Sequence, residues 1–135
     1  MNVQIDFDKS GGLVPAIIQD EASGDVLMLG FMNEASYRET RRTGEVVFFS
    51  RSRNRLWRKG ESSGHVLKVR DVRIDCDADA LLVRVSPIGP GVCHEGYRSC
   101  FFRSLDENGL SRLVLTPTFA PEQVYRKPAP SGEAD

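Results

Sequence analysis

The stretch that decides how this chain is organised runs from Asp75 to Cys100 and reads DCDADALLVRVSPIGPGVCHEGYRSC. It holds all three cysteines of the protein and one of its two histidines. Three aspartates alternate around the first cysteine. Soft sulfur ligands suit zinc, whereas clustered carboxylates suit magnesium, manganese or calcium. The stretch therefore predicts two adjacent metal sites of different chemical hardness.

The aspartates are expected in a turn, because apolar, strand-like runs flank them at 65–74 and 80–85. In a straight strand Asp75 and Asp79 would lie about 13 Å apart, too far to hold one ion. In a turn, Asp75, Asp77 and Asp79 can surround a single hard cation. A solvated acidic turn is the alternative, and the embedded Cys76 favours a metal site over it.

Cys93 and Cys100 are separated by six residues that include Gly96, enough chain to bring both sulfurs to one metal. Three protein ligands leave a fourth position on zinc for water, whose pKa then falls to about 7. Adjacent residues seldom bind one ion, so His94 is predicted as a proton shuttle rather than a ligand. A surface histidine with a backbone partner is the alternative for His94. His65 either touches substrate or begins a strand.

A basic segment precedes this stretch. Arg51, Arg53 and Arg55 alternate, Trp57, Arg58 and Lys59 follow, and the loop 60–64 adds Ser62 and Ser63. Arginine forks, serine hydroxyls and an open glycine backbone suit phosphate, and an aromatic ring can stack on a base. The alternatives are a charged edge strand, a core role for Trp57, and a surface for single-stranded nucleic acid. A single tryptophan offers few rings on which the bases of a nucleic acid could stack, so we expect a small phosphorylated ligand.

The rest of the chain predicts a β-rich α+β fold with mostly antiparallel strands and one main helix. We expect a hairpin of strands 13–20 and 26–32, then a helix over 34–43 with Asn33 as N-cap and Gly44 as C-cap. Further strands are expected at 45–50, from 101 and at 113–115, after a flexible lead-in over 1–12. One domain would span 1–110, with a C-terminal extension over 111–135 whose last part, 126–135, is proline-rich and predicted to be disordered.

Composition limits the partners and the compartment. The chain has 135 residues, 40% hydrophobic and 27% charged, with a net charge of −1, so no global attraction to nucleic acid or acidic membranes is expected. No apolar run approaches the roughly 20 residues of a membrane span. We see no export signal, and three cysteines cannot all pair within one chain, which together predict a cytoplasmic protein with thiolates held for metal.

The sequence resembles the phosphoribosyl-AMP cyclohydrolases of histidine biosynthesis. The matching pieces are GLVPA at 12–16, VLMLGFMN at 26–33, FSRSR at 49–53, LWRKGESSG at 56–64, DCDADALL at 75–82, and Gly89-Pro90 leading to Cys93-His94 and Arg98-Ser99-Cys100-Phe101. They run in order over about 12–103. Leu67 stands where the family pattern has glutamine, Gly91-Val92 expands the usual Gly-Pro-Ala-Cys by one residue, and the tail after Ser104 lies outside the match.

The resemblance implies a zinc- and magnesium-dependent hydrolase that opens the adenine ring of 1-(5-phosphoribosyl)-AMP at its N1–C6 bond, giving the formimino-carboxamide ribotide. It implies zinc bound by Cys76, Cys93 and Cys100, and magnesium bound by Asp75, Asp77 and Asp79. It also implies an intertwined homodimer, in which Cys76 meets Cys93 and Cys100 of the other chain. The candidate substrate-binding residues are Arg51, Arg53, Trp57, Lys59, Ser62, Ser63, His65 and Arg98.

Two other classes of protein share part of this residue pattern. A nucleobase deaminase would carry an H-x-E motif and a P-C-x-x-C pair, whereas here His94 and Glu95 are adjacent and the cysteines lie further apart. A structural zinc module that binds nucleic acid would need a closed site with four ligands. The sequence offers three cysteines and a poor fourth ligand, so both classes rank below the cyclohydrolase.

Overall fold

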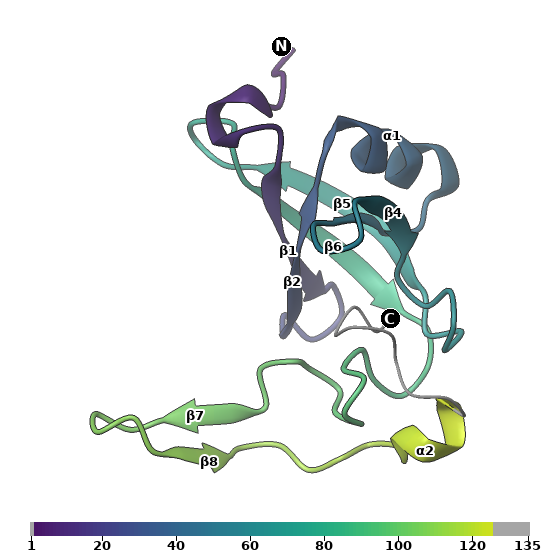
Figure 1. Ribbon diagram of the computed structural model, residues 1–135, viewed down its shortest axis with the longest axis vertical. Helices are drawn as coiled ribbons and strands as arrows, with labels where there is room; N and C mark the ends of the chain where they lie inside the picture. The colour runs from purple at the N-terminus through teal and green to yellow at the C-terminus, as the bar shows by residue number, and fades with distance from the viewer. Residues whose placement is uncertain (1, 126–135) are drawn as a thin grey trace.

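The computed structural model describes residues 2–125, in which strands predominate and one helix is long (Figure 1). The elements, in chain order, are a 3-10 helix at Asp8–Ser10, β1 at Val14–Asp20, β2 at Val26–Met32, α1 at Glu34–Thr43, β3 at Val47–Ser50, β4 at Arg55–Arg58, β5 at Leu67–Ile74, β6 at Leu81–Pro87, β7 at Arg103–Leu105, β8 at Ser111–Leu113 and α2 at Pro121–Val124. The predicted β-rich α+β class is confirmed. The tail expected to be disordered, 126–135, lies outside the described residues.

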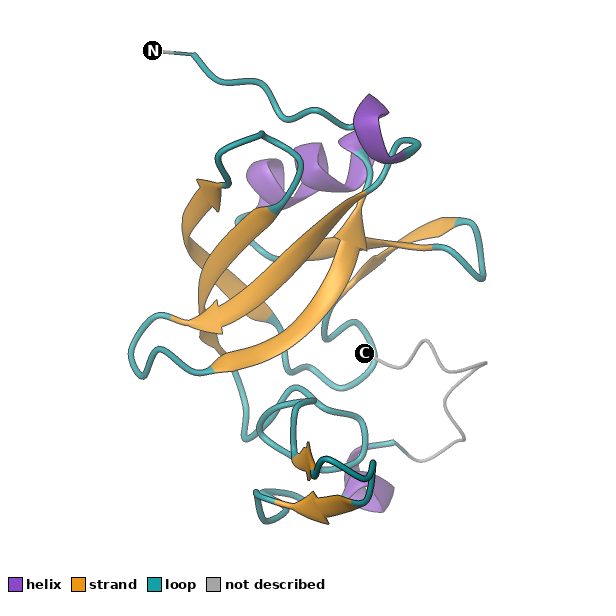
Figure 2. Cartoon of the chain, turned by 90° about the vertical axis from the view of Figure 1, so that its left-hand side faces the viewer, coloured by secondary structure: helices purple, strands orange, loops and turns teal. Residues whose placement is uncertain are grey.

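The central sheet has four strands in the order β2-β1-β6-β5 (Figure 2). The predicted hairpin of β1 and β2 is confirmed, β5 and β6 are also antiparallel, and β1 and β6 form a parallel pair. Residues of β1 alternate between buried and half-buried, with Val14, Ala16 and Ile18 fully buried. Because β6 runs the length of the sheet, the turn before it and the loop after it lie at opposite ends of the sheet (Figure 1).

The helix α1 begins and ends where the sequence predicts. The Asn33 side chain accepts a hydrogen bond from the Ser36 amide at 2.8 Å, and the Ser36 hydroxyl accepts one from the Asn33 amide at 2.9 Å, which together form a capping box. Gly44 ends the helix at φ 75°.

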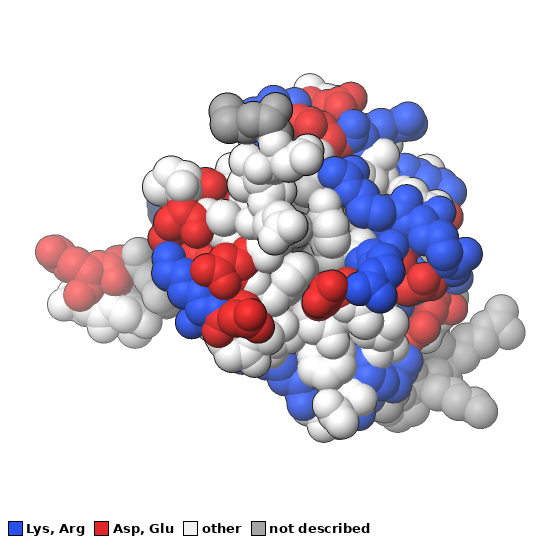
Figure 3. All heavy atoms as spheres, turned by 90° about the horizontal axis from the view of Figure 1, so that it is seen from above, with Lys and Arg blue, Asp and Glu red and all other residues white. Residues whose placement is uncertain are grey.

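The buried Thr40 hydroxyl donates a hydrogen bond to the Val47 carbonyl and accepts one from the Val47 amide, and so joins α1 to β3. Acidic and basic side chains intermingle on the face seen in Figure 3.

A second, two-stranded sheet pairs β3 with β4, and β4 occupies part of the segment that the sequence marked as basic. Arg55 and Arg58 of β4 are exposed, whereas Trp57 between them is buried, with its ring 5.2 Å from that of Phe48. A Cβ at Gly30 of β2 would come within 2.4 Å of the Phe48 ring, so this close approach requires glycine. β4 thus has the form of a charged edge strand, and Trp57 lies in the core. Both were alternatives that the sequence left open.

The first residues are held against the body of the protein rather than forming the expected flexible lead-in. The Asp6 amide donates to the carbonyl of Ala78 at 2.7 Å, and the Phe7 ring lies 6.3 Å from that of Tyr37 on α1. This segment therefore contacts the turn between β5 and β6, whose Asp75, Cys76 and Asp77 remain exposed. Among the described residues, no helix has the length and apolar character that crossing a membrane requires.

The capping box gives a test of how α1 is fixed. We expect Asn33→Ala to lower the free energy of unfolding by about 1 kcal/mol, because the Ser36 amide loses its acceptor. Asn33→Ser keeps a capping oxygen and is the matched control. Urea unfolding followed by circular dichroism measures both variants, and equal stability of the two would show that the cap contributes nothing.

Candidate metal centre

The turn between β5 and β6 brings the three aspartates together, as the sequence predicts. One oxygen from each of Asp75, Asp77 and Asp79 can be chosen so that all three lie within 4.8 Å of one another. The Asp75 carboxylate fixes the turn by accepting hydrogen bonds from the amides of Asp79 and Ala80 at 3.0 and 3.1 Å. Three carboxylates at this spacing match the donors that magnesium prefers.

An ammonium group from the N-terminal segment lies among these carboxylates. The Lys9 Nζ atom is 2.7 Å from Asp77 and 3.2 Å from Asp79. Its hydrogen bond lowers the pKa of Asp77 to about 2, whereas the hydrogen bond with ionised Asp77 raises the pKa of Asp79. Lys9 could not be identified from the sequence, because its partner Asp77 is 68 positions away.

Cys93 and Cys100 are also brought together, in the loop that follows β6. A tight turn shapes this loop, with the Gly96 amide bonded to the Cys93 carbonyl at 3.0 Å and the Cys93 amide to the Tyr97 carbonyl at 3.1 Å. A hydrogen bond from the Cys100 thiol lowers the pKa of Cys93 to about 6, and the same bond raises the pKa of Cys100. Two adjacent thiols, one with an acidic pKa, fit a soft metal such as zinc.

Cys76 does not join them within one chain. It lies in the aspartate turn before β6, whereas Cys93 and Cys100 come after this strand. A strand of seven residues such as β6 spans about 20 Å. The aspartate triad is the one group of three metal-binding side chains among residues 2–125, and no group of three includes a cysteine.

Both histidines lie near the cysteine loop in sequence or in space. His94 is exposed in the turn directly after Cys93. His65 is half-buried, with its Nδ1 atom 2.9 Å from the Gly91 carbonyl and its ring edge-on to Phe119 at 5.1 Å. The Thr118 amide donates to the Gly96 carbonyl at 2.8 Å, so part of the expected C-terminal extension also contacts this loop.

The predicted substrate residues are spread over several environments. Arg51 lies over the Phe31 ring at 4.1 Å, Lys59 is buried with its Nζ atom 5.8 Å from the Trp57 ring centre, and the Ser63 hydroxyl accepts from the His65 amide at 3.1 Å. Arg53 is half-buried and Ser62 exposed. A groove of about 860 Å³ lies between the N-terminal segment and α1 and reaches Asp77, but none of the predicted substrate residues lines it.

The chain is similar to known proteins over most of its length. The family model described as phosphoribosyl-AMP cyclohydrolase matches residues 28–102. The chain belongs to this family. Relatives named phosphoribosyl-AMP cyclohydrolase include that of Solibacter usitatus, 56% identical over 91% of this chain and 97% of the relative, and that of Oleidesulfovibrio alaskensis, 53% identical over 90% and 92%. That of Pelobacter propionicus is 51% identical over 93% and 99%. The protein is thus an enzyme of the phosphoribosyl-AMP cyclohydrolase family, and the match contains the aspartate turn, Cys76, Cys93 and Cys100.

The ion pair at the aspartate turn gives a pH prediction. The folded pKa of Asp77, about 2, lies below the ordinary 3.8, so the ion pair stabilises the fold above pH 3.8 and this contribution disappears as the pH falls through about 2. Lys9→Met should raise the pKa of Asp77 in metal-free protein, whereas Lys9→Arg should keep it low. Carboxyl NMR titration measures the pKa, and equal values in the Met variant and the wild type would refute the pairing.

Proposed function

We propose that this protein is a zinc- and magnesium-dependent hydrolase that opens the N1–C6 bond of the adenine ring in 1-(5-phosphoribosyl)-AMP, a step of L-histidine biosynthesis. The observation that carries the proposal is the pair of donor sets, three carboxylates at one end of β6 and two thiols at the other, in a chain of this family. In the reaction, the oxygen of water bonds to C6 and the exocyclic nitrogen on C6 takes one proton of the water. As the N1–C6 bond breaks, N1 takes the other proton and C6 becomes the carbon of a carboxamide.

The thiols of Cys93 and Cys100 fit a zinc ion, because the Cys100 thiol already hydrogen-bonds to Cys93 and lowers its pKa to about 6. Zinc, when bound, supplies a Lewis acid that lowers the pKa of water toward about 7. The carboxylates of Asp75, Asp77 and Asp79 fit magnesium. Lys9 pairs with two of these carboxylates, so magnesium would compete with its ammonium group for them.

A second copy of the chain would supply the third thiol, that of Cys76. The separation of Cys76 from Cys93 and Cys100 within one chain supports this arrangement. So does the hairpin of β7 and β8, which extends beyond the central sheet (Figures 1 and 2). Leu105, Leu110 and Leu113 on this hairpin are 71%, 70% and 61% exposed. Apolar side chains in such a projecting arm favour burial against another subunit.

The chain's own residues would position the substrate and move the proton. His94 is exposed next to Cys93, where its imidazole can take a proton from the attacking water. Arg51, Ser62 and Ser63 lie in the segment that leads to His65, and their guanidinium and hydroxyl groups suit the substrate phosphates. His65 is fixed by Gly91 and Phe119, so it joins this segment to the cysteine loop.

An ultraviolet absorbance assay tests the proposal directly. We expect zinc-loaded protein to change the spectrum of 1-(5-phosphoribosyl)-AMP when magnesium is added, because ring opening alters the chromophore. Cys93→Ser should lose zinc and lower turnover by more than about 100-fold, the upper limit of what a supporting residue costs. Asp77→Asn should keep zinc and require more magnesium.

Two outcomes of this assay would contradict the proposal. An unchanged spectrum with folded, zinc-loaded protein and magnesium would mean that the assigned chemistry is wrong. Full zinc content and turnover in Cys93→Ser would mean that the zinc ligands are wrong, whatever the substrate.

A further inference from the structure

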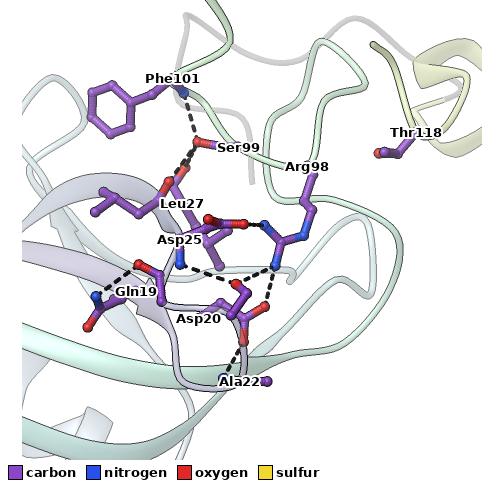
Figure 4. Close-up of polar contacts among 12 residues, drawn as sticks. Gln19, Asp20, Ala22, Asp25, Leu27, Arg98, Ser99, Phe101 and Thr118 are labelled. Atoms are coloured by element: carbon purple, nitrogen blue, oxygen red, sulfur yellow. Dashed lines mark hydrogen bonds and ion pairs between the residues drawn. The ribbon is translucent and has the colours of Figure 1, made fainter. Parts of the chain in front are cut away.

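Arg98, expected from the sequence as a substrate contact, is hydrogen-bonded to the end of β1 and to the turn that joins β1 to β2 (Figure 4). Its guanidinium donates to Asp25 at 2.6 Å, to Ser23 at 3.1 Å, and to Asp20. Asp20, at the end of β1, is 7% exposed. Charge-assisted hydrogen bonds from a rigid arginine fork are strong and fix the direction of the side chain.

The two residues after Arg98 are fixed to the same hairpin. The Ser99 hydroxyl donates to the Val26 carbonyl at 2.8 Å and accepts from the Phe101 amide at 3.0 Å. The Cys100 amide donates to the Leu27 carbonyl at 2.7 Å. Residues 98–100 therefore attach the end of the cysteine loop to the β1–β2 hairpin, and Cys100 takes its position from this attachment.

The turn that receives Arg98 is itself well ordered by hydrogen bonds. The second oxygen of the Asp20 carboxylate accepts from the Ala22 amide at 2.9 Å, and the Asp20 amide donates to the Asp25 carbonyl at 2.8 Å. Asp20 can therefore serve as a fixed support for the guanidinium.

The local charge opposes a phosphate contact by Arg98. One guanidinium cation lies between two carboxylates, those of Asp20 and Asp25, so the cluster carries a net negative charge. A substrate phosphate would be repelled by this net negative charge, and one of the two carboxylates, that of Asp20, is nearly buried against the guanidinium.

We propose that Arg98 is a positioning residue for the zinc site, which clamps residues 98–100 to the β1–β2 hairpin and so keeps Cys100 beside Cys93. The inference rests on the proposed function, in which these two thiols bind zinc. The clamp acts through Asp20 and Asp25, two residues without an expected role in binding substrate. Loss of the clamp would let Cys100 move away from Cys93 and weaken zinc binding.

Zinc affinity, measured by competition with a chromogenic chelator, tests the clamp. Arg98→Gln and Asp20→Asn should each weaken zinc binding by about tenfold or more, as loss of a group that orients a ligand does. The double variant should bind zinc no more weakly than Arg98→Gln alone, because both changes remove the same interaction. Arg98→Lys, which keeps the charge but not the fork, should fall between Arg98→Gln and wild type.

Controls separate the clamp from other effects. Arg73→Gln breaks an ion pair with Asp71, outside both donor sets, and should leave zinc affinity unchanged. One outcome would refute the clamp. In it, Arg98→Gln binds zinc normally but has a KM raised about tenfold when saturated with zinc, and Asp20→Asn changes neither zinc affinity nor KM. Arg98 would then bind substrate. If Cys100→Ser retains zinc, the zinc assignment itself fails and the inference falls with it. Thermal unfolding by circular dichroism checks that each variant is folded.

Discussion

The length of β6 is the constraint on which the rest of this molecule depends. Hydrogen bonds to β1 on one side and β5 on the other keep its seven residues extended. The carboxylate turn therefore lies at one end of the strand and the cysteine loop follows the other (Figure 1). Within one chain the strand separates the oxygen donors, together with Cys76, from Cys93 and Cys100. The proposed zinc site with three thiolates thus requires a second chain, whereas the three carboxylates proposed for magnesium all lie in one chain.

In the metal-free protein each donor set is held together by a partner from the chain itself. Lys9 neutralises part of the charge at the aspartate turn, and the Cys100 thiol donates a hydrogen bond to Cys93. Binding of a metal would replace an ammonium group at one set and a thiol proton at the other. Such exchange links metal affinity to pH, because ligands must be deprotonated to bind. It also means that the donors are gathered before a metal arrives, which limits the reorganisation that binding requires.

Features with a local signal could be predicted from the sequence. Asn33 and Gly44 mark the ends of α1 by their own chemistry, and the apolar runs on either side of Asp75 and Asp79 require a turn between them. The strand β4 was obscured because Arg55 and Arg58 look like a charged surface, although Trp57 between them is buried. Contacts between distant residues leave no such pattern: Lys9 and Asp77 are 68 positions apart, and Arg98 and Asp20 are 78. Sequence reasoning therefore singled out the carboxylates and thiols that the structure brings together, but it missed Lys9 and gave Arg98 a different role.

The most direct test of the shared zinc site is the activity of a mixed dimer. A Cys76→Ser chain and a Cys93→Ser chain, each inactive alone, can be co-expressed with different tags and purified through both. If Cys76 of one chain completes the site of the other, each mixed dimer retains one intact site of two and should show about half of the wild-type turnover. If all three cysteines served one chain, both sites of the mixed dimer would be damaged. An inactive mixed dimer, folded and supplied with zinc and magnesium, would therefore contradict the account.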